Sequence, residues 1–389
     1  MQVYQNIEDG DSMYNSLAEQ FKRNGHNITV VASSVNNSTG IRNEGGFNVL
    51  RVKTLSLFRV HPYLKGIANL LIGKQFGRAI KAHLGDKSFD LIVTPTPPIT
   101  LTFLTSRLKR KFKATTYLIL RDIFPQNAID IGLLTKWNPI YYFFRFAEKH
   151  LYRNIDHIGC MTFGNIRYLI EKNPSLDVSK IHLLPNWNKC SEIKGEDNSD
   201  IIEKHGLKDK FIAIFGGNIG LPQKVENIIE LAKIHLDKKD LFFIIVGRGT
   251  QKAILMHLAK ENKLTNLLFI DHLKREEYEK YVKLSNIGLI SLNENFTIPN
   301  IPSRTLSYYN YKLPVFAIVD KVTDYPEMLE VDKSGLSCIC GDFESYKEKF
   351  DKLYYNKELR CEMGENGYKA LVSKYNPESA YNTIMSEIK

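Results

Sequence analysis

Short runs of aliphatic and β-branched residues alternate along the whole chain with longer segments in which apolar residues recur at helical spacing. This alternation is typical of βαβ units, in which helices cover buried parallel strands. In the first half, strands are predicted at 27–33, 47–53, 90–95, 114–121, 157–162 and 181–185. In the second half, they are predicted at 211–217, 241–247, 267–270, 287–291, 314–319 and 336–340. The pattern therefore predicts an α/β protein with two consecutive doubly wound domains.

A polar, turn-rich stretch at 189–208 separates the two sets of strands. A last helix is expected to open at Asn376 and Pro377, a cap followed by proline at the first helical position. The expected parts of the chain are therefore 1–190, 191–375 and a last helix at 376–389.

The amino terminus departs from this pattern. A doubly wound domain normally starts with a buried strand, yet Met1 to Gln5 is all that precedes a polar loop and a helix reaching about Asn24. Either the first strand is very short or the recorded start lies inside the gene.

The composition is that of a folded globular protein, with 389 residues, 43% hydrophobic and 25% charged. Five cysteines form neither a disulfide framework nor the paired spacing of a zinc site, so reduced cytosolic thiols are expected. No stretch reaches the roughly 18 apolar residues of a membrane span, and a signal peptide is not evident. We therefore expect a cytoplasmic protein that can touch a membrane from that side.

The charge is unevenly distributed. The net charge of +10 divides into +12 for residues 1–190 and −2 for the remainder, and 45–121 alone carries fourteen Lys or Arg against two acids. A basic surface of this kind attracts an anionic partner, which can be a membrane, a nucleic acid or an acidic substrate.

The segment 211–236 contains the first candidate site. A predicted strand ends in Gly216-Gly217-Asn218-Ile219-Gly220, and a helix is expected to begin at Pro222 with Lys224 in its first turn. Glycines allow a ligand to approach the backbone, and the amides of a helix start bind anions. A lysine there is unfavourable unless an anion is bound. An ordinary glycine turn with a solvated lysine explains the same residues equally well.

A second candidate site lies in 300–314, where Ser303 is expected to cap a short helix that begins with Arg304. Arginine presents a planar fork that suits phosphate oxygens, although an exposed arginine on a capped helix is the simpler interpretation of this segment alone. Two such sites at sheet edges favour a bound diphosphate. A third edge, Val246-Gly247-Arg248-Gly249-Thr250, could pass close to a base or ribose.

Several segments resemble the retaining glycosyltransferases of family 4, and most closely the bacterial branch that extends surface polysaccharides with sugars such as N-acetylfucosamine. A G-N-x-G turn followed by Gln resembles Gly217-Asn218-Ile219-Gly220 with Gln223. The other similar segments span about 90 to 320 and are Thr94-Pro95-Thr96-Pro97-Pro98, Arg121-Asp122-Ile123-Phe124-Pro125-Gln126, Leu184-Pro185-Asn186-Trp187, Pro302-Ser303-Arg304-Thr305-Leu306-Ser307 and Lys312-Leu313-Pro314-Val315.

The resemblance implies the GT-B fold, two Rossmann-like domains facing a central cleft, with the last helix crossing back to the first domain. It implies a hexosyltransferase-type enzyme that moves a sugar from a nucleotide-sugar, expected to be a UDP-sugar, with retention of configuration and without a metal or other cofactor. Lys224 and Arg304 would act on the diphosphate, and Asp122 would face the transferred sugar, although a loop carboxylate paired with Arg121 is an equal alternative. The implied donor contacts are Gly217, Asn218, Lys224, Arg248, Gly249, Ser303, Arg304, Thr305 and Ser307.

One departure from the family concerns a pair of glutamates, the second of which contacts ribose in the wider family. These positions are Pro299 and Ser307 here. The closer branch tolerates serine at the second position, so we still expect an active enzyme. The identity of the donor is less certain. A glycine-rich loop expected near Gly10 is equally in doubt.

The basic region offers an acceptor and membrane surface. Leu64, Ile67, Leu71 and Ile80 can form an apolar stripe, and basic amphipathic segments bind anionic membranes. A helix face that packs internally is an equal alternative for any single helix. We expect docking on the inner face of the cytoplasmic membrane and a lipid-diphosphate-linked sugar or oligosaccharide as acceptor. The residues assigned to this surface are Lys65, Lys74, Arg78, Lys81, Lys109, Arg110 and Lys111.

Nucleic acid is a second anionic partner that the basic charge alone would allow. It is disfavoured, because the basic clusters contain no reading motif and the neighbouring aromatics resemble core or membrane contacts. The aromatic run 141–146 is interpreted as a buried helix after Pro139. The alternatives to an active transferase in capsule, O-antigen or exopolysaccharide synthesis are an inactive nucleotide-sugar-binding subunit and a nucleotide-sugar epimerase.

Overall fold

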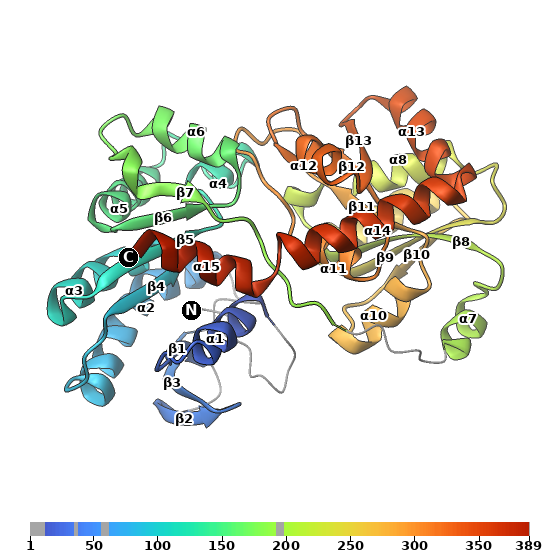
Figure 1. Ribbon diagram of the computed structural model, residues 1–389. Helices are drawn as coiled ribbons and strands as arrows, with labels where there is room; N and C mark the ends of the chain where they lie inside the picture. Colours follow the sequence, from blue (N-terminus) through green and yellow to red (C-terminus); the bar gives the residue numbers. More distant parts are fainter. Residues whose placement is uncertain (1–11, 35–37, 56–61, 192–197, 389) are drawn as a thin grey trace. The chain divides into compact units, whose positions relative to one another are not determined.

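The computed structural model describes residues 12–34, 38–55, 62–191 and 198–388, and the chain forms two compact units (Figure 1). Unit 1 is Met1–Pro185 with Pro377–Lys389, and unit 2 is Asn186–Asn376. The chain therefore passes from unit 1 to unit 2 shortly before the boundary expected at 190, and its last helix belongs to unit 1. The first strand and the loop near Gly10 fall outside the described residues.

Unit 1 contains two sheets. The smaller has the order β1-β3-β2, in which β1 and β3 are parallel and β2 is antiparallel. The larger has the order β4-β5-β6-β7 and is parallel throughout. The strands are β1 (Thr29–Ser34), β2 (Gly40–Glu44), β3 (Phe47–Lys53), β4 (Leu91–Pro95), β5 (Thr115–Leu120), β6 (His157–Cys160) and β7 (Ile181–Leu183).

The helices of unit 1 cover these sheets. On α2, Ile72, Phe76 and Ile80 follow helical spacing and pack into one core cluster with β3 and α3. At the end of the chain, Tyr381 packs against Phe21 of α1, with ring centroids 4.9 Å apart. The helices are α1 (Met13–Arg23), α2 (Pro62–Leu84), α3 (Thr102–Phe112), α4 (Gln126–Asp130), α5 (Pro139–Asn154), α6 (Phe163–Lys172) and α15 (Pro377–Ile388).

Unit 2 contains one parallel sheet with the order β10-β9-β8-β11-β12-β13. In the chain order of this unit, that is 3-2-1-4-5-6, the order of a doubly wound Rossmann-like domain. The strands are rich in β-branched and aromatic residues and are largely buried, as parallel strands covered on both faces should be. They are β8 (Phe211–Asn218), β9 (Leu241–Arg248), β10 (Leu267–Ile270), β11 (Ile287–Ser291), β12 (Val315–Val319) and β13 (Gly335–Ile339).

Helices cover both faces of this sheet (Figure 1). One face packs its core against α8, α9 and α13, and the other against α10, α11, α12 and α14. The helices are α7 (Ser199–His205), α8 (Glu226–Ile234), α9 (Lys252–Glu261), α10 (Arg275–Lys283), α11 (Arg304–Asn310), α12 (Tyr325–Asp332), α13 (Phe343–Tyr355) and α14 (Lys357–Ser373). Helix α7 lies inside the stretch that the sequence pattern assigned to the linker.

The aromatic run 141–146 is helical, but the prediction that this helix is buried is wrong. Asn138 caps α5 by accepting a hydrogen bond from the Ile140 amide, and Pro139 occupies the first turn. The described core uses the later part of α5, where Ala147 and Leu151 are buried. The side chains of Tyr142, Phe143 and Phe146 are exposed.

Candidate functional site

In unit 2 the strand order reverses between β8 and β11, which are neighbours in the sheet. Connections that leave such a pair diverge to opposite faces, and the space beyond the carboxyl ends of the strands is where doubly wound domains bind ligands. Gly217 and Asn218 end β8, Lys224 follows in the next turn, and Glu294 follows β11. The predicted donor residues of the first segment therefore lie at this position.

Lys224 adopts an unusual backbone conformation. After β8 the chain forms a short 3₁₀ helix, Leu221–Gln223, and Lys224 follows with a φ of 37°. Helix α8 begins at Glu226, so the prediction that Lys224 lies in the first turn of a helix starting at Pro222 is wrong. A left-handed conformation costs a non-glycine residue about 1–3 kcal/mol and persists only where neighbouring groups enforce it.

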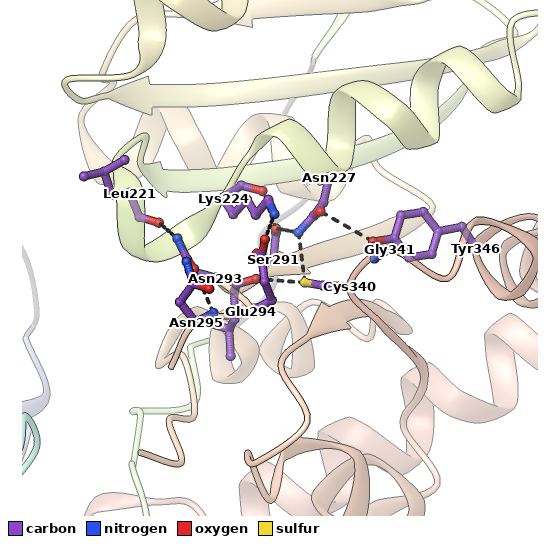
Figure 2. Close-up of polar contacts among 11 residues, drawn as sticks. Leu221, Lys224, Asn227, Ser291, Asn293, Glu294, Asn295, Cys340, Gly341 and Tyr346 are labelled. Carbon is purple, nitrogen blue, oxygen red and sulfur yellow. Dashed lines mark hydrogen bonds and ion pairs between the residues drawn. The ribbon is translucent and has the colours of Figure 1, made fainter. Parts of the chain in front are cut away.

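A buried polar network enforces this conformation (Figure 2). The Ser291 hydroxyl donates to the Lys224 carbonyl oxygen at 2.8 Å. The Asn227 amide donates to the Ser291 Oγ at 3.0 Å and to the Cys340 Sγ at 3.3 Å. Because Ser291 ends β11 and Asn227 belongs to α8, the network joins two elements of the unit through Lys224. The backbone of Lys224, from which its side chain starts, is therefore fixed before any ligand binds.

The Lys224 ammonium forms an ion pair with Glu294 (Figure 2). The Glu294 loop is fixed by its neighbour Asn293, whose amide nitrogen donates to the Pro222 carbonyl and whose Nδ2 donates to the Leu221 carbonyl, both at 2.9 Å. The two charged side chains are about one-third exposed, at 31% for Lys224 and 39% for Glu294. A partly solvated pair of this kind is weak, so a stronger anion can displace Glu294.

Arg304, the first residue of α11, lies over the ring of Phe215, with Cζ 4.5 Å from the ring centroid. It also lies against the backbone of β8, since a Cβ at Gly217 would be 3.1 Å from Cζ. Burial lowers the pKa of Arg304, and the groups that oppose this shift are tyrosine hydroxyls, with Tyr308 foremost. Its Nη1 is buried without a hydrogen-bond partner in the described part of the chain. Such a guanidinium is suited to an anionic ligand.

The ends of β8 and β9 meet backbone to backbone. A Cβ on Gly247 would overlap the Gly217 carbonyl, and a Cβ on Gly249 would overlap the Ile219 carbonyl. The Ile219 amide donates to the Arg248 carbonyl at 2.9 Å. Gly249 therefore has a packing function in this structure, whereas the Arg248 side chain is exposed.

The remaining predicted donor residues differ in their accessibility. Ser303 is exposed and precedes α11 at the cap position, as predicted, but its side chain forms no capping hydrogen bond. The Thr305 side chain is fully buried, and its hydroxyl lies 2.6 Å from that of Tyr325, so a donor contact of this residue stays a prediction that concerns its backbone. Ser307 is half-buried. Asn218 is exposed, and its Nδ2 donates a hydrogen bond to the Gln223 Oε1.

In unit 1, Asp122 follows the carboxyl end of β5. The preceding Arg121 joins three strand ends, because its amide donates to the Thr96 Oγ1 at 3.1 Å and its Nη1 donates to the Leu184 carbonyl at 3.2 Å. Asp122 is exposed, yet enough protein surrounds the carboxyl that loss of water raises its pKa, while the charge of Arg121 opposes this shift. Burial raises the pKa of Tyr14 on α1. The charges of Arg121 and Asp122 shift this pKa in opposite directions, so the tyrosine lies close to both residues.

The predicted basic surface divides into exposed and structural residues. Lys74, Arg78, Lys81, Arg110 and Lys111 are exposed. Lys109 differs from these residues, because it donates to Asp156 at 2.5 Å and to the Asn154 carbonyl at 3.0 Å, and its assignment to a membrane surface stays a prediction. The side chain of Lys65 lies outside the described residues.

Of the apolar stripe predicted on α2, Ile80 is not available as a membrane contact, and the side chains of Leu64 and Ile67 lie outside the described residues. Ile80 is buried in the core cluster that also contains Ile72 and Phe76. This outcome corresponds to the alternative of an internally packed helix face. Among the described residues, no helix is both long and apolar enough to cross a membrane.

The sequence pattern missed Glu294 and the Ser291 network. A usable signal was present, because Asn293-Glu294-Asn295 directly follows the predicted strand 287–291. In a parallel sheet the polar residues that follow neighbouring strands meet at one edge. The sequence pattern could not show that β11 and β8 are neighbours in the sheet.

The comparisons with known proteins agree with this architecture. Residues 197–370 match the family model described as "Glycosyl transferases group 1". The chain is 21% identical over 280 residues to WbjE of Pseudomonas aeruginosa, named a probable glycosyltransferase, covering 72% of this chain and 69% of that protein. It is 25% identical over 206 residues to the capsular polysaccharide biosynthesis glycosyltransferase CapM of Staphylococcus aureus, covering 49% and 51%.

The fold has solved counterparts. The crystal structure of Anabaena HepE in complex with UDP matches with a TM-score of 0.69 at 11% identity, over 99% of this chain and 97% of that one. At this identity the likeness concerns the fold, which is that of known glycosyltransferase structures. Residues 197–370 thus match the glycosyl transferases group 1 family, and together with the relatives and the fold this similarity shows a glycosyltransferase with the GT-B fold.

Proposed function

We propose that the protein transfers a sugar, with retention of configuration, from a UDP-sugar to a lipid-diphosphate-linked sugar in bacterial surface polysaccharide synthesis. The reaction would take place at the inner face of the cytoplasmic membrane. The observation that carries the proposal is the position of Lys224 and Arg304 at the strand-order reversal of unit 2, where Arg304 has a buried, unused donor. The names of WbjE and CapM and the UDP bound to HepE support it.

In the proposed reaction, the two cations stabilise the diphosphate as it leaves. Negative charge accumulates on the leaving group when the glycosidic bond to it breaks, and donors fixed beforehand at that place accelerate the step. Arg304 is fixed by its packing on Phe215, and Lys224 by the Ser291 network. The backbone of Gly217 is exposed beside Arg304 and stays accessible to a ligand. The chain's own cations thereby supply the charge that a metal supplies in other transferases, and no cofactor is part of the proposal.

On unit 1 we assign Asp122 to the acceptor side of the reaction. Its carboxylate would orient the sugar or accept the proton of the attacking hydroxyl, and a raised pKa suits a group that exchanges protons. Arg121 keeps the loop in place through contacts with two other strand ends.

The pH dependence of the reaction tests this assignment. If the ionised Asp122 is required, turnover is complete above its pKa and falls as the pH decreases through it, at a pH above the range of an ordinary aspartate. Rates measured from mildly acidic to neutral pH should show this limb in the wild type. Asp122→Asn should lower the rate and remove the limb. If the pH profile of the variant were the same as that of the wild type, Asp122 would have no role in the reaction.

Glu294 gives a second test, on donor affinity. In the free protein it neutralises Lys224, and a diphosphate has to displace it. Glu294→Gln should therefore tighten binding of the nucleoside diphosphate by up to about fivefold, the equivalent of an exposed ion pair of about 1 kcal/mol. Titration calorimetry at low and high salt would measure this. Weaker binding in the variant would mean that Glu294 contacts the nucleotide instead.

A thermal-shift screen against UDP-, GDP- and dTDP-sugars tests the proposal as a whole. We expect stabilisation by one nucleotide class, because a ligand that binds only the folded state raises its stability. No response to any of the three would contradict the proposed donor site.

A further inference from the structure

Unit 1 exposes a continuous aromatic surface formed by α3 and α5. Phe103 of α3 lies 6.3 Å from Phe146 and 6.5 Å from Phe143 of α5, measured between ring centroids. All three rings are exposed, Phe146 to 59%. Tyr142, one turn before Phe146, is 62% exposed. We call these four residues the aromatic face. Soluble proteins seldom leave contiguous large rings exposed without a binding partner.

The segment that leads into α5 extends this apolar character. Trp137 is 91% exposed, and Leu133 is 68% exposed. Lys136, beside the tryptophan, is also exposed. Tryptophan and tyrosine next to lysine or arginine are typical of the interfacial zone of membranes, where the rings reach the acyl boundary and the cations reach the headgroups.

The same two helices become basic toward their carboxyl ends. His150 of α5 contacts Phe103, with ring centroids 5.0 Å apart. Burial lowers the pKa of His150, and the charges of the nearby Arg153 and Arg110 lower it further. On helical spacing, Phe103, Arg107 and Arg110 share one face of α3. Lys149 and Arg153 are likewise exposed on the face of α5 that carries Phe146. We call Arg107, Arg110, Lys149 and Arg153 the basic end.

Negative charge is scarce around this surface. Helix α3 contains no acidic residue, and the single acidic residue of α5 is Glu148. Glu148 is 2% exposed and forms an ion pair with Arg145, so it does not offset the basic end at the surface. The surface therefore combines apolar rings with uncompensated cations, which complements an anionic bilayer.

The aromatic face lies toward the edge of the sheet that carries Asp122. Strands β4 and β5 are parallel, and the helices that follow them run back in the opposite direction, so α3 and α5 begin near the carboxyl ends of the strands. Phe124, two residues after Asp122, packs on Phe144 of α5 with ring centroids 4.7 Å apart. The loop of Asp122 is thus directly attached to the helix that presents the aromatic face.

We propose that α3 and α5 dock on an anionic bilayer, with the aromatic face and Trp137 inserted at the headgroup level and the basic end on the lipid phosphates. The inference rests on the proposed lipid-linked acceptor, whose diphosphate would then lie at the depth of the headgroups near the Asp122 edge. It assigns the membrane contact to α5, in place of the apolar stripe predicted on α2, whose Ile80 is buried in the core.

A second copy of the chain is the other occupant that this surface could accept. A two-fold symmetric dimer brings the same surface of both copies together. With the axis along the helices, the two basic ends would face each other without exposed acidic residues of α3 or α5 to separate them, which is unfavourable. With the axis across the helices, each basic end would face the rings of the other copy and would likewise gain no acidic partner. The charge pattern therefore favours the bilayer.

Tryptophan fluorescence provides a direct test, because the chain contains two tryptophans and only one is exposed. Trp187 is buried and Trp137 is almost fully exposed. In a Trp187→Phe variant, Trp137 alone reports on the surface. With equimolar phosphatidylglycerol and phosphatidylcholine vesicles, we expect its emission to shift to shorter wavelength and to be quenched by brominated acyl chains. Vesicles of phosphatidylcholine alone should give a much smaller effect.

Matched variants locate the contact by vesicle sedimentation of the full chain. Tyr142→Ser with Phe146→Ser should reduce binding by at least about tenfold, since each ring removes a large apolar area. Phe163→Ser with Val331→Ser, which removes two exposed apolar side chains elsewhere, should leave binding unchanged. Charge reversal of the basic end, as Arg107→Glu with Arg153→Glu, should remove the preference for anionic lipid. Thermal unfolding confirms that each variant is folded.

The outcomes are distinct. Vesicle binding without quenching of Trp137, or equal binding by the aromatic and control variants, would overturn the proposed surface. A shift of Trp137 emission that depends on protein concentration without vesicles, together with a dimer in sedimentation velocity, would assign the surface to a second copy. Because these measurements need no nucleotide, failure here is separate from failure of the thermal-shift screen, which concerns the donor.

Discussion

Replacing Lys224 by Ala is expected to lower kcat by about 10²- to 10³-fold, the typical effect of removing one preorganised donor from a site of developing negative charge. The structure accounts for the size of this effect. The left-handed backbone of Lys224, with a φ of 37°, is fixed by the Ser291 hydroxyl, so the side chain starts from a fixed position at the carboxyl edge of the sheet. Steady-state rates of sugar transfer over a range of donor concentrations would measure the loss.

The matched control for this variant is Lys233→Ala, on the following helix α8. Lys233 is exposed and pairs only weakly with Glu230, at 3.6 Å, so its removal should leave turnover unchanged. The melting temperatures of both variants should equal that of the wild type, since both lysines lie at the surface. If Lys224→Ala retained full turnover, the assignment of Lys224 to the leaving group would be refuted.

Replacing Arg304 by Met should weaken donor binding by about ten- to hundredfold, the equivalent of one or more charge-assisted hydrogen bonds. The same change should leave the ligand-free protein as stable as before or more stable. Burial already disfavours the charge of Arg304, and its Nη1 has no partner in the described part of the chain. Replacing a buried, poorly compensated charge by an apolar side chain of similar size is often neutral or stabilising.

Arg360 provides a control with the same stacking geometry. Its guanidinium lies over Phe211, the first residue of β8, 4.8 Å from the ring centroid. Unlike Arg304, it donates to the Leu353 and Tyr354 carbonyls. Arg360→Met should therefore destabilise the fold and leave donor affinity unchanged. We therefore expect Arg304→Met to weaken donor binding without loss of stability, and Arg360→Met to lower stability without loss of donor binding. If Arg304 were purely structural, Arg304→Met would give the same results as Arg360→Met.

The strand pattern of both halves could be predicted because buried parallel strands appear as short apolar runs. The edge strand β2 could not, since Gly40–Glu44 reads G-I-R-N-E and lacks such a run. It forms because the chain reverses at Gly45 and Gly46, both with positive φ, and pairs with β3. A search for glycine turns would have identified this hairpin.

The exposure of α5 could not be derived from its sequence. The run Tyr141 to Phe146 is aromatic on almost every side, so no periodicity indicates which side is buried. Tertiary packing determines which side is buried: Ala147 and Leu151 lie in the core, and Phe146 is exposed. The sequence thus predicted a helix correctly and its environment wrongly.

Part of the candidate site was accessible from the sequence. The glycine turn after β8 and Arg304 at the start of α11 follow from local signals, and both lie at the carboxyl edge of the sheet. The conformation of Lys224 and the burial of Thr305 depend on Ser291 and Tyr325, which are distant in the sequence. Contacts of this kind are set by the order of the strands, which no local pattern encodes.

The central claim is that Lys224 and Arg304 together bind the diphosphate of a nucleotide donor. Titration calorimetry of UDP into the wild type and into a Lys224→Ala, Arg304→Met double variant tests it most directly. We predict binding to the wild type and a loss of at least about a hundredfold in the double variant, since each cation contributes a charge-assisted contact. Equal binding of UDP by both proteins, or no binding of UDP, GDP or dTDP by the wild type, would contradict it.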